Sequence, residues 1–201
     1  GMTGMLWPGA ETMLAATARK RNIPYCLSSV ACETPETIGA IAGANAWFQL
    51  YTIVDKDAEA DLVRRAGDSG FSVLVVTIDV PVNSTRERQR KAGLARQGLS
   101  LSRLGHIAAR PQWAAATARR GMPALRMLEK YFDASGVDNI MEYVDQQRLG
   151  DVDLAHLATL RKLWKGPLVV KGIMHEADAK ACLEIGADGI WVSNHGARQF
   201  D

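Results

Sequence analysis

The stretch Gly186 to Asp201 reads GADGIWVSNHGARQFD, and it predicts both a fold element and a site. Its apolar run, Gly189 to Val192, is typical of a buried strand. The polar residues Ser193, His195 and Arg198 follow the run. A proton acceptor and a fixed cation therefore stand directly after a strand. This pairing suits an anionic substrate that must lose a proton.

Similar β-rich runs occur earlier in the chain, with helical patterns between them. The runs cover Ile23 to Ser28, Trp47 to Tyr51, Ser72 to Thr77 and Leu168 to Lys171. The helical patterns cover Glu11 to Arg21, Thr34 to Ala42, Asp55 to Ala66, Asp153 to Trp164 and Glu176 to Ile185. Strands that alternate with helices at this spacing predict right-handed βαβ units and a parallel sheet.

Capping signals support the helix boundaries. Thr34 stands before a proline, which is the pattern of an N-cap followed by proline at the first helical position. Asp55 and Asp153 are further N-cap candidates. Gly67 and Gly186 are predicted to be the glycines that end the helices before them.

Each predicted strand ends on polar side chains. The residues are Ser28, then Gln49 and Tyr51, then Thr77 and Asp79, then Lys171, then Ser193 and His195. Polar groups at the same edge of several parallel strands favour a (β/α)8 barrel, in which sites lie at the carboxyl ends of the strands. We therefore predict an α/β fold, an incomplete TIM barrel over residues 1–201 with about five of eight strands. An open doubly wound sheet is the alternative, but no G-x-G-x-x-G turn follows an early strand.

The stretch from about residue 80 to 150 is too long for a simple connection, and we predict a long insertion at about 86–150, after the strand that ends at Thr77. Residues 86–120 carry nine basic side chains and one acidic side chain, although the whole chain has a net charge of only +2. One interpretation is a solvated loop. Another is contact with an anionic membrane surface, and the segment has no clean helical period. No nucleic-acid motif accompanies the charge, so we do not expect nucleic acid as a partner.

Composition sets further bounds. The chain has 201 residues, 47% of them hydrophobic, which is enough for the core of one domain. Its three cysteines form no metal-binding spacing, and a sparse, odd set fits a reducing compartment. We predict no metal site, and a cytoplasmic protein with peripheral contact to the inner membrane face as the open alternative.

The candidate site residues follow from pairs that share a strand face. Gln49 and Tyr51 are two positions apart, as are Thr77 and Asp79, so each pair points to one side of its strand. A carboxylate at a strand end can orient a histidine base, as Asp79 would orient His195.

Two guanidinium groups beside this histidine, Arg86 and Arg198, would suit a carboxylate substrate, because arginine binds carboxylates with two hydrogen bonds. Arg86 can also be read as one more solvated cation of the basic segment. Lys171 ends an apolar strand, where a lysine needs an anion or an electron-rich ring beside it.

At these residues the sequence resembles the FMN-dependent α-hydroxy acid oxidising family. The matching stretches are LSS at 27–29, WFQLY at 47–51, TIDVPVNSTRE at 77–87, VKGI at 170–173 and the closing GADGIWVSNHGARQFD. MLWPGAE near the start, and ARPQW and RRGMPAL in the insertion, resemble the mandelate and lactate dehydrogenase branch more than plant glycolate oxidase.

The resemblance implies a role for each matching residue. His195 would be the base that takes the substrate proton, Asp79 would stabilise its imidazolium, and Tyr51 would lie near the substrate oxygen. Arg86 and Arg198 would hold the substrate carboxylate. The residues implied as FMN contacts are Ser28, Gln49, Thr77, Lys171 and Ser193. The implied reaction is FMN-dependent oxidation of an L-2-hydroxy acid, lactate-like or mandelate-like, to the 2-keto acid.

The resemblance leaves several points open. Val30 stands where plant glycolate oxidases carry a large aromatic residue, which leaves room for a bulkier substrate. The family pattern extends beyond both ends of the chain, so we expect the FMN phosphate site and three strands to lie outside it, and the fragment alone to be inactive. A non-catalytic remnant without flavin is the alternative. The implied partners are the hydroxy acid, a quinone or oxygen as electron acceptor, and a second copy of the chain in a homo-oligomer.

Overall fold

The computed structural model describes residues 2–80, 101–135 and 152–197. Its centre is a parallel sheet of five strands in the order β1-β2-β3-β4-β5, which is also their order along the chain. The strands are β1 (Tyr25–Ser28), β2 (Ala46–Tyr51), β3 (Val73–Thr77), β4 (Leu168–Ile173) and β5 (Gly189–Val192). All four neighbouring pairs are parallel, so the predicted βαβ arrangement is confirmed.

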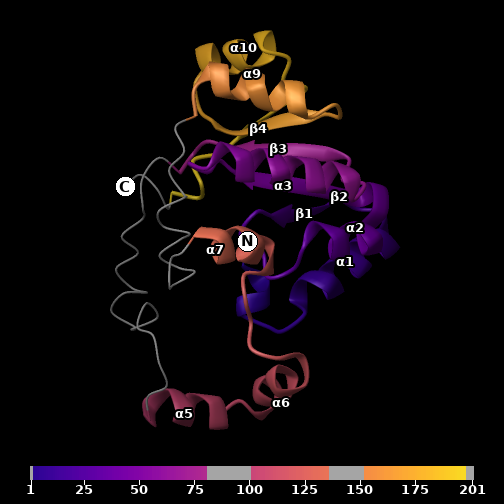
Figure 1. Cartoon of the computed structure of the whole chain (residues 1–201), viewed down its shortest axis with the longest axis vertical. Helices are drawn as coiled ribbons and strands as arrows, with labels where there is room; N and C mark the ends of the chain where they lie inside the picture. Colours follow the sequence, from indigo (N-terminus) through magenta and orange to yellow (C-terminus); the bar gives the residue numbers. More distant parts are fainter. Residues whose placement is uncertain (1, 81–100, 136–151, 198–201) are drawn as a thin grey trace.

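The helices form one layer against this sheet. They are η1 (Thr3–Met5), α1 (Ala10–Arg21), α2 (Pro35–Ala42), η2 (Gly43–Asn45), α3 (Lys56–Asp68), α9 (Leu154–Leu163) and α10 (Glu176–Glu184). Contacts run from α1 to α2, from α2 to α3, from α3 to α9 and from α9 to α10. The helices thus keep the order of the strands (Figure 1). This stepwise arrangement of strands and helices is that of an incomplete (β/α)8 barrel.

The core lies between the sheet and the helices. Leu27, Phe48, Leu74 and Leu168 are in register on four adjacent strands, and each is at most 1% exposed. Successive strand residues point to opposite faces, so the residues between them face away from the helices. On β2 these are Trp47, Gln49 and Tyr51, all intermediate in burial. The helices therefore cover the apolar face of β2, and the predicted site residues lie on the other face.

The predicted caps are largely confirmed. Thr34 accepts a hydrogen bond from the backbone of Thr37, Asp55 from two backbone N–H groups of the first turn, and Asp153 from that of His156. The prediction for Gly67 is wrong, because α3 continues to Asp68. Gly70 instead adopts the left-handed conformation after this helix, with a φ of 82°.

The part of the insertion that the structure describes is helical. It contains α5 (Leu101–Ala108), α6 (Pro111–Arg120) and α7 (Arg126–Ser135), although we expected no clean helical period over residues 86–120. Arginine and alanine favour helices, and Pro111 occupies the first position of α6, where it costs no hydrogen bond. In Figure 1, α5 and α6 lie apart from the sheet, whereas α7 lies close to it.

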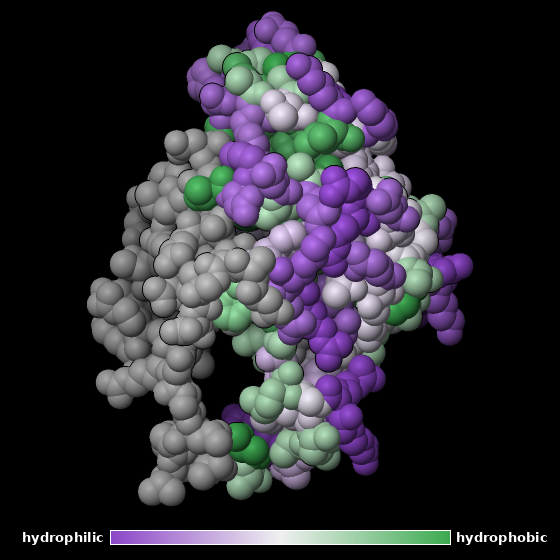
Figure 2. Space-filling model, viewed as in Figure 1, coloured by the Kyte–Doolittle hydropathy of each residue, from purple (hydrophilic) through white to green (hydrophobic). Residues whose placement is uncertain are grey.

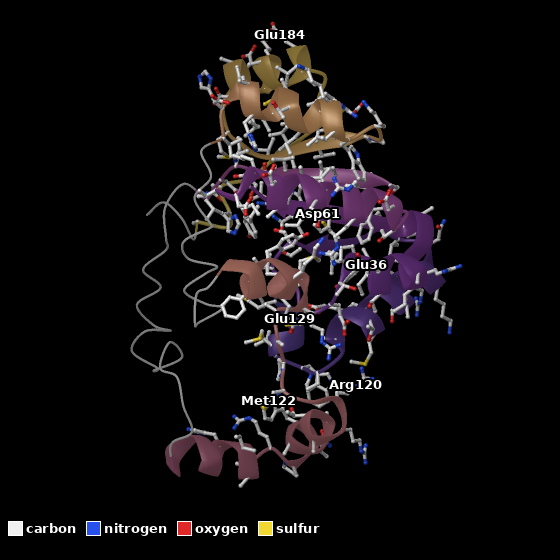
Figure 3. The ribbon with its side chains drawn as sticks, in the orientation of Figure 1. Glu36, Asp61, Arg120, Met122, Glu129 and Glu184 are labelled. Atoms are coloured by element: carbon white, nitrogen blue, oxygen red, sulfur yellow. The ribbon has the colours of Figure 1, made fainter. Side chains whose placement is uncertain are left out.

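A network of charged and phenolic side chains fixes α7 to the barrel helices. Tyr131 donates a 2.7 Å hydrogen bond to Asp61 on α3 and accepts one of 3.1 Å from Arg65. Arg65 also makes two hydrogen bonds to Glu36 on α2. Figure 3 shows Glu36 and Asp61 on the side of α2 and α3 that faces α7, and Figure 2 shows hydrophilic residues gathered over these helices. Tyr131 is only 9% exposed. Its hydrogen bonds to Asp61 and Arg65 attach α7 to α3.

Candidate active site

The candidate site lies at the carboxyl edge of the sheet, where Asp79 collects three hydrogen-bonding partners. Its Oδ1 atom lies 2.7 Å from Nδ1 of His195. Its Oδ2 atom accepts hydrogen bonds of 2.8 Å from Nζ of Lys171 and 2.8 Å from Oγ of Ser193. The structure therefore brings together residues from three neighbouring strands: Asp79 follows β3, Lys171 lies within β4, and Ser193 and His195 follow β5.

The environment of Asp79 keeps its carboxylate ionised. Asp79 is only 5% exposed, and burial alone would raise its pKa. The hydrogen bonds from Lys171, His195 and Ser193 act in the opposite direction and together hold the pKa below the ordinary 3.8. A carboxylate that stays ionised at neutral pH can stabilise a positive charge on the imidazole beside it.

The turn after β5 fixes the orientation of His195. Its backbone has a φ of 59°, in the left-handed region that few non-glycine residues adopt. The backbone N–H of His195 donates a 3.0 Å hydrogen bond to Oγ of Ser193. The same Ser193 hydroxyl donates to Asp79, so it connects the histidine backbone to the carboxylate that holds the ring. A strained backbone that several hydrogen bonds hold in place is a common feature of functional sites.

Tyr51 approaches the same histidine from the other side. Its hydroxyl lies 3.4 Å from Nε2 of His195, and the two rings are 6.2 Å apart. With Nδ1 facing Asp79, Nε2 is the ring nitrogen that can accept a proton from another molecule. The structure therefore places the phenol, at the end of β2, beside the candidate base, in the turn after β5.

A second polar row crosses the first three strands. The hydroxyl of Ser28 donates a 2.7 Å hydrogen bond to Oε1 of Gln49, and Nε2 of Gln49 donates a 2.8 Å hydrogen bond to the hydroxyl of Thr77. Ser28 and Gln49 are paired in register, as are Thr77 and Lys171. All four residues were predicted to contact a flavin, and they lie on the face of the sheet opposite the helices, where Ser28 and Thr77 are only 2% and 4% exposed.

Gly172 lets the strand β4 approach Asp79 closely. A Cβ atom at this glycine would lie 2.6 Å from Cβ of Asp79 and 2.7 Å from its backbone nitrogen, and the φ of Gly172 is 111°. No other residue type fits there without movement. The glycine thus allows Lys171, its neighbour, to reach the carboxylate.

Two predicted residues, Arg86 and Arg198, lie outside the described part of the chain. Within the described residues, no group of three or more His, Cys, Asp or Glu side chains is placed to hold a metal ion.

Two buried acids near this edge were not predicted. Glu11 is 1% exposed, and its Oε1 atom accepts hydrogen bonds from the backbone of Gly4 and Cys32. Glu59 is 2% exposed and accepts one from the backbone of Ile53. The sequence did contain a signal for the burial of Glu59, because this residue lies on the apolar stripe of its helix, three residues before Leu62.

Comparison with known proteins agrees with this geometry. The sequence pattern of the family described as FMN-dependent dehydrogenase matches residues 1–201. The L-lactate dehydrogenase of Caulobacter vibrioides (strain NA1000 / CB15N) is 36% identical over 203 residues, and that of Alcaligenes faecalis is 34% identical. The alignments cover 100% of this chain but only 53% and 54% of those proteins, so the chain spans about half the length of its curated relatives.

The solved structures give the same result. A crystal structure of the monotopic membrane protein (S)-mandelate dehydrogenase superposes with a TM-score of 0.89 at 32% identity, over 100% of this chain and 54% of the other. A soluble mutant of the membrane-associated (S)-mandelate dehydrogenase from Pseudomonas putida gives a TM-score of 0.75 at 29% identity, over 100% of this chain and 51% of the other.

Proposed function

Because the chain belongs to the FMN-dependent dehydrogenase family, we propose that it carries the acid–base part of an enzyme that oxidises an L-2-hydroxy acid to the 2-keto acid. The observation that carries the proposal is the 2.7 Å pair of His195 and Asp79 at the edge of the sheet. The residues of this cluster lie in or directly after three neighbouring strands, β3, β4 and β5. A base oriented in this way is suited to take a proton from the substrate.

The polar surface beside this pair fits FMN. Ser28, Gln49 and Thr77 offer hydroxyl and amide groups in one row, and Lys171 supplies a cation next to it. We assign these residues, with Ser193, to the isoalloxazine ring. When bound, FMN would accept the two electrons that leave the hydroxy acid. A positive side chain such as Lys171 suits the negative charge that a reduced ring carries.

The protein side of the reaction follows from the hydrogen bonds. His195 takes the substrate proton at Nε2, because Nδ1 faces Asp79. The Asp79 carboxylate then stabilises the imidazolium. Tyr51, whose hydroxyl lies 3.4 Å from Nε2, faces the substrate oxygen and orients it toward the base.

The substrate carboxylate is assigned to Arg86 and Arg198, on the residue types and their places in the sequence. Arginine binds a carboxylate with two parallel hydrogen bonds, which lysine cannot do. Each Arg→Lys change should therefore reduce kcat/KM, by roughly 10-fold or more for a charged hydrogen bond of about 1.5–3 kcal/mol. If both lysine variants keep the original kcat/KM, the carboxylate binds elsewhere.

The substrate is assigned to the lactate-like or mandelate-like class. The relatives named above are L-lactate and (S)-mandelate dehydrogenases, and Val30 leaves space beside the site for a side chain larger than that of glycolate. A quinone or oxygen would accept the electrons. Steady-state rates with lactate, mandelate and glycolate, with a dye or oxygen as acceptor, test this assignment. Turnover of glycolate alone would contradict it.

Peripheral membrane contact is proposed for the α5–α6 end of the molecule. Exposed basic residues, Arg110, Arg119 and Arg120, occur there, and Leu6 and Met122 are 77% and 74% exposed. Trp113 on α6 donates a hydrogen bond to the backbone of Leu6. Figure 2 shows hydrophobic residues beside hydrophilic ones at this end.

Flotation with liposomes tests this contact. Anionic lipid should bind the protein at low salt, and neutral lipid should not, because each basic residue near the surface contributes about 1 kcal/mol before screening. A protein that stays unbound to anionic lipid would contradict it. No helix in the described ranges is long and apolar enough to cross a membrane. A cytoplasmic homo-oligomer remains our prediction.

A non-catalytic scaffold that keeps these residues without flavin is the second candidate, because the chain spans only about half of its relatives. Flavin absorbance separates the two functions when it is measured on the full-length protein, because this chain spans only about half of its relatives and we expect the FMN phosphate site to lie outside it. A protein that neither purifies with FMN nor binds added FMN would favour the scaffold.

A further inference from the structure

We infer that Glu59 is a positioning residue, which holds the segment after β2 and thereby places Tyr51 against His195. This inference rests on the function proposed above. Glu59 is a buried acid that does not belong to the polar cluster around Asp79. Glu59 lies on the first turn of α3, and its side chain is 3% exposed. A buried carboxylate is costly unless every oxygen has a partner, so its contacts indicate what it does.

Glu59 and Lys56 bind the two backbone groups of Ile53. The Oε2 atom of Glu59 accepts a 2.9 Å hydrogen bond from the N–H of Ile53. The Nζ atom of Lys56 donates a 2.9 Å hydrogen bond to the carbonyl of the same residue. Ile53 comes two residues after Tyr51 and is only 6% exposed. Both side chains belong to the first turn of one helix, so α3 holds this segment at two points.

The other oxygen of Glu59 connects the segment to a second helix. Oε1 lies 2.8 Å from Nε2 of His156, on the first turn of α9. This histidine is 13% exposed, and Asp153 accepts a hydrogen bond from its backbone N–H, so its position is fixed. Since Nε2 faces a carboxylate, it carries the proton of this contact. Glu59 thus joins α3, α9 and the segment after β2.

The contacts of Glu59 lie close enough to Tyr51 to affect its position in the candidate site. Helices that follow parallel strands begin at the carboxyl edge of the sheet, which is the edge of the candidate site. Tyr51 is the last residue of β2, and its backbone N–H is held by Oγ of Ser29. Only one residue separates Tyr51 from Ile53. Loss of the Ile53 contacts should therefore loosen Tyr51 and lengthen its approach to His195.

Amide hydrogen exchange tests whether Glu59 restrains the segment at Ile53, and it does not depend on catalytic activity. In the FMN-bound protein, Glu59→Ala should raise the exchange rate of the Ile53 amide by about 10-fold or more, the factor that corresponds to loss of one hydrogen bond to a charged group. Glu59→Gln, which keeps a carbonyl oxygen for this amide, should restore most of the protection. Asp57→Ala changes an exposed acid of the same turn and is the matched control. Unchanged exchange in Glu59→Ala would overturn the inference.

A double-mutant cycle tests the link to the site. Glu59→Ala should lower kcat/KM by about 10-fold to 100-fold, the scale of a displaced reacting group, and should have little further effect in a Tyr51→Phe background. Fully additive effects would mean that Glu59 does not act through Tyr51, and would overturn the inference.

If Glu59→Ala fails to fold, Lys56→Met replaces it in the double-mutant cycle, because this change removes the bond to the carbonyl of Ile53. The Lys56 side chain is half exposed, so its loss leaves no buried gap. Effects that are fully additive with those of Tyr51→Phe would again overturn the inference. A protein that oxidises no hydroxy acid but shows the exchange result would contradict the proposed function and still support the hold of Glu59 on Ile53.

Discussion

The Nδ1 atom of His195 and the Oδ1 atom of Asp79 lie 2.7 Å apart, although 116 positions separate the two residues. The sheet accounts for this contact, because β3 and β5 both pair with β4 and end at the same edge. Asp79 follows β3, and His195 follows β5. Two residues that lie far apart in the linear sequence thus form one hydrogen-bonded pair.

The first prediction concerns the charge of Asp79. Asp79→Asn keeps the size of the side chain but removes the charge that would stabilise the imidazolium, so turnover should fall by about 10²-fold or more. FMN absorbance should be retained. Steady-state kinetics with the hydroxy acid measures the effect. Unchanged turnover in a flavin-bound variant would remove Asp79 from the proton transfer.

The lowered pKa of Asp79 also predicts an acid dependence of stability. A carboxyl whose folded-state pKa is depressed contributes stability above its unfolded pKa of about 3.8, and this contribution disappears as the pH falls through the folded value. The difference in unfolding free energy between wild type and Asp79→Asn should therefore shrink as the pH falls below 3.8. Denaturant titrations across this range measure it.

The second prediction concerns Lys171. Lys171→Met removes the cation that bonds to Asp79 and that is assigned to the flavin, so FMN should dissociate more readily. The dissociation constant should rise by roughly 10-fold, as expected for a lost hydrogen bond to a charged group. Fluorescence titration with FMN measures the change. Lys165→Met, at an exposed position before β4, is the control. Equal affinities in the two variants would contradict the assignment.

The third prediction separates close contact from backbone strain. Gly172→Ala introduces a Cβ atom within 2.6 Å of Asp79, whereas Gly70→Ala, also at positive φ, meets nothing within 4 Å. Both variants should lose about 1–2 kcal/mol from left-handed strain. Only Gly172→Ala should lose more than this and also reduce turnover. Thermal unfolding and kinetics of the two variants provide the comparison, and equal losses would show that the contact with Asp79 is unimportant.

The fourth prediction concerns the attachment of α7. Tyr131→Phe should lower the free energy of unfolding by about 1 kcal/mol, because the hydroxyl bonds to Asp61 and Arg65. Burial, followed by the bond to Asp61, raises the pKa of Tyr131 to about 12. Stability from this residue is therefore present below pH 10 and is lost as the pH rises toward 12. The variant should lack this alkaline loss, which pH-dependent unfolding would detect.

The sequence was sufficient to predict the sheet and most of the site. Strand periodicity placed Gln49 and Tyr51 on one face, and the parallel order brought Asp79, Lys171 and His195 to one edge. Local capping by Thr34 was predicted because it depends on neighbouring residues alone.

The errors and omissions have physical reasons too. Gly67 was taken for a helix end, but glycine is tolerated inside a helix at a cost of only about 1 kcal/mol. The contact of Glu59 with His156 joins segments that lie far apart in the sequence, and no local pattern encodes it. The α5 and α6 helices were not predicted, although Leu101, Leu104 and Ala108 recur at helical spacing in α5 and could have indicated it.

The most direct test of the account is the rate of flavin reduction in a single turnover. The full-length protein with FMN bound is mixed anaerobically with L-lactate or (S)-mandelate, and the loss of flavin absorbance is followed in wild type and His195→Gln. The account predicts rapid bleaching in wild type, and a rate at least about 10²-fold lower in the variant, which should retain its flavin. Bleaching at the same rate in both proteins would contradict the role of His195 as the base.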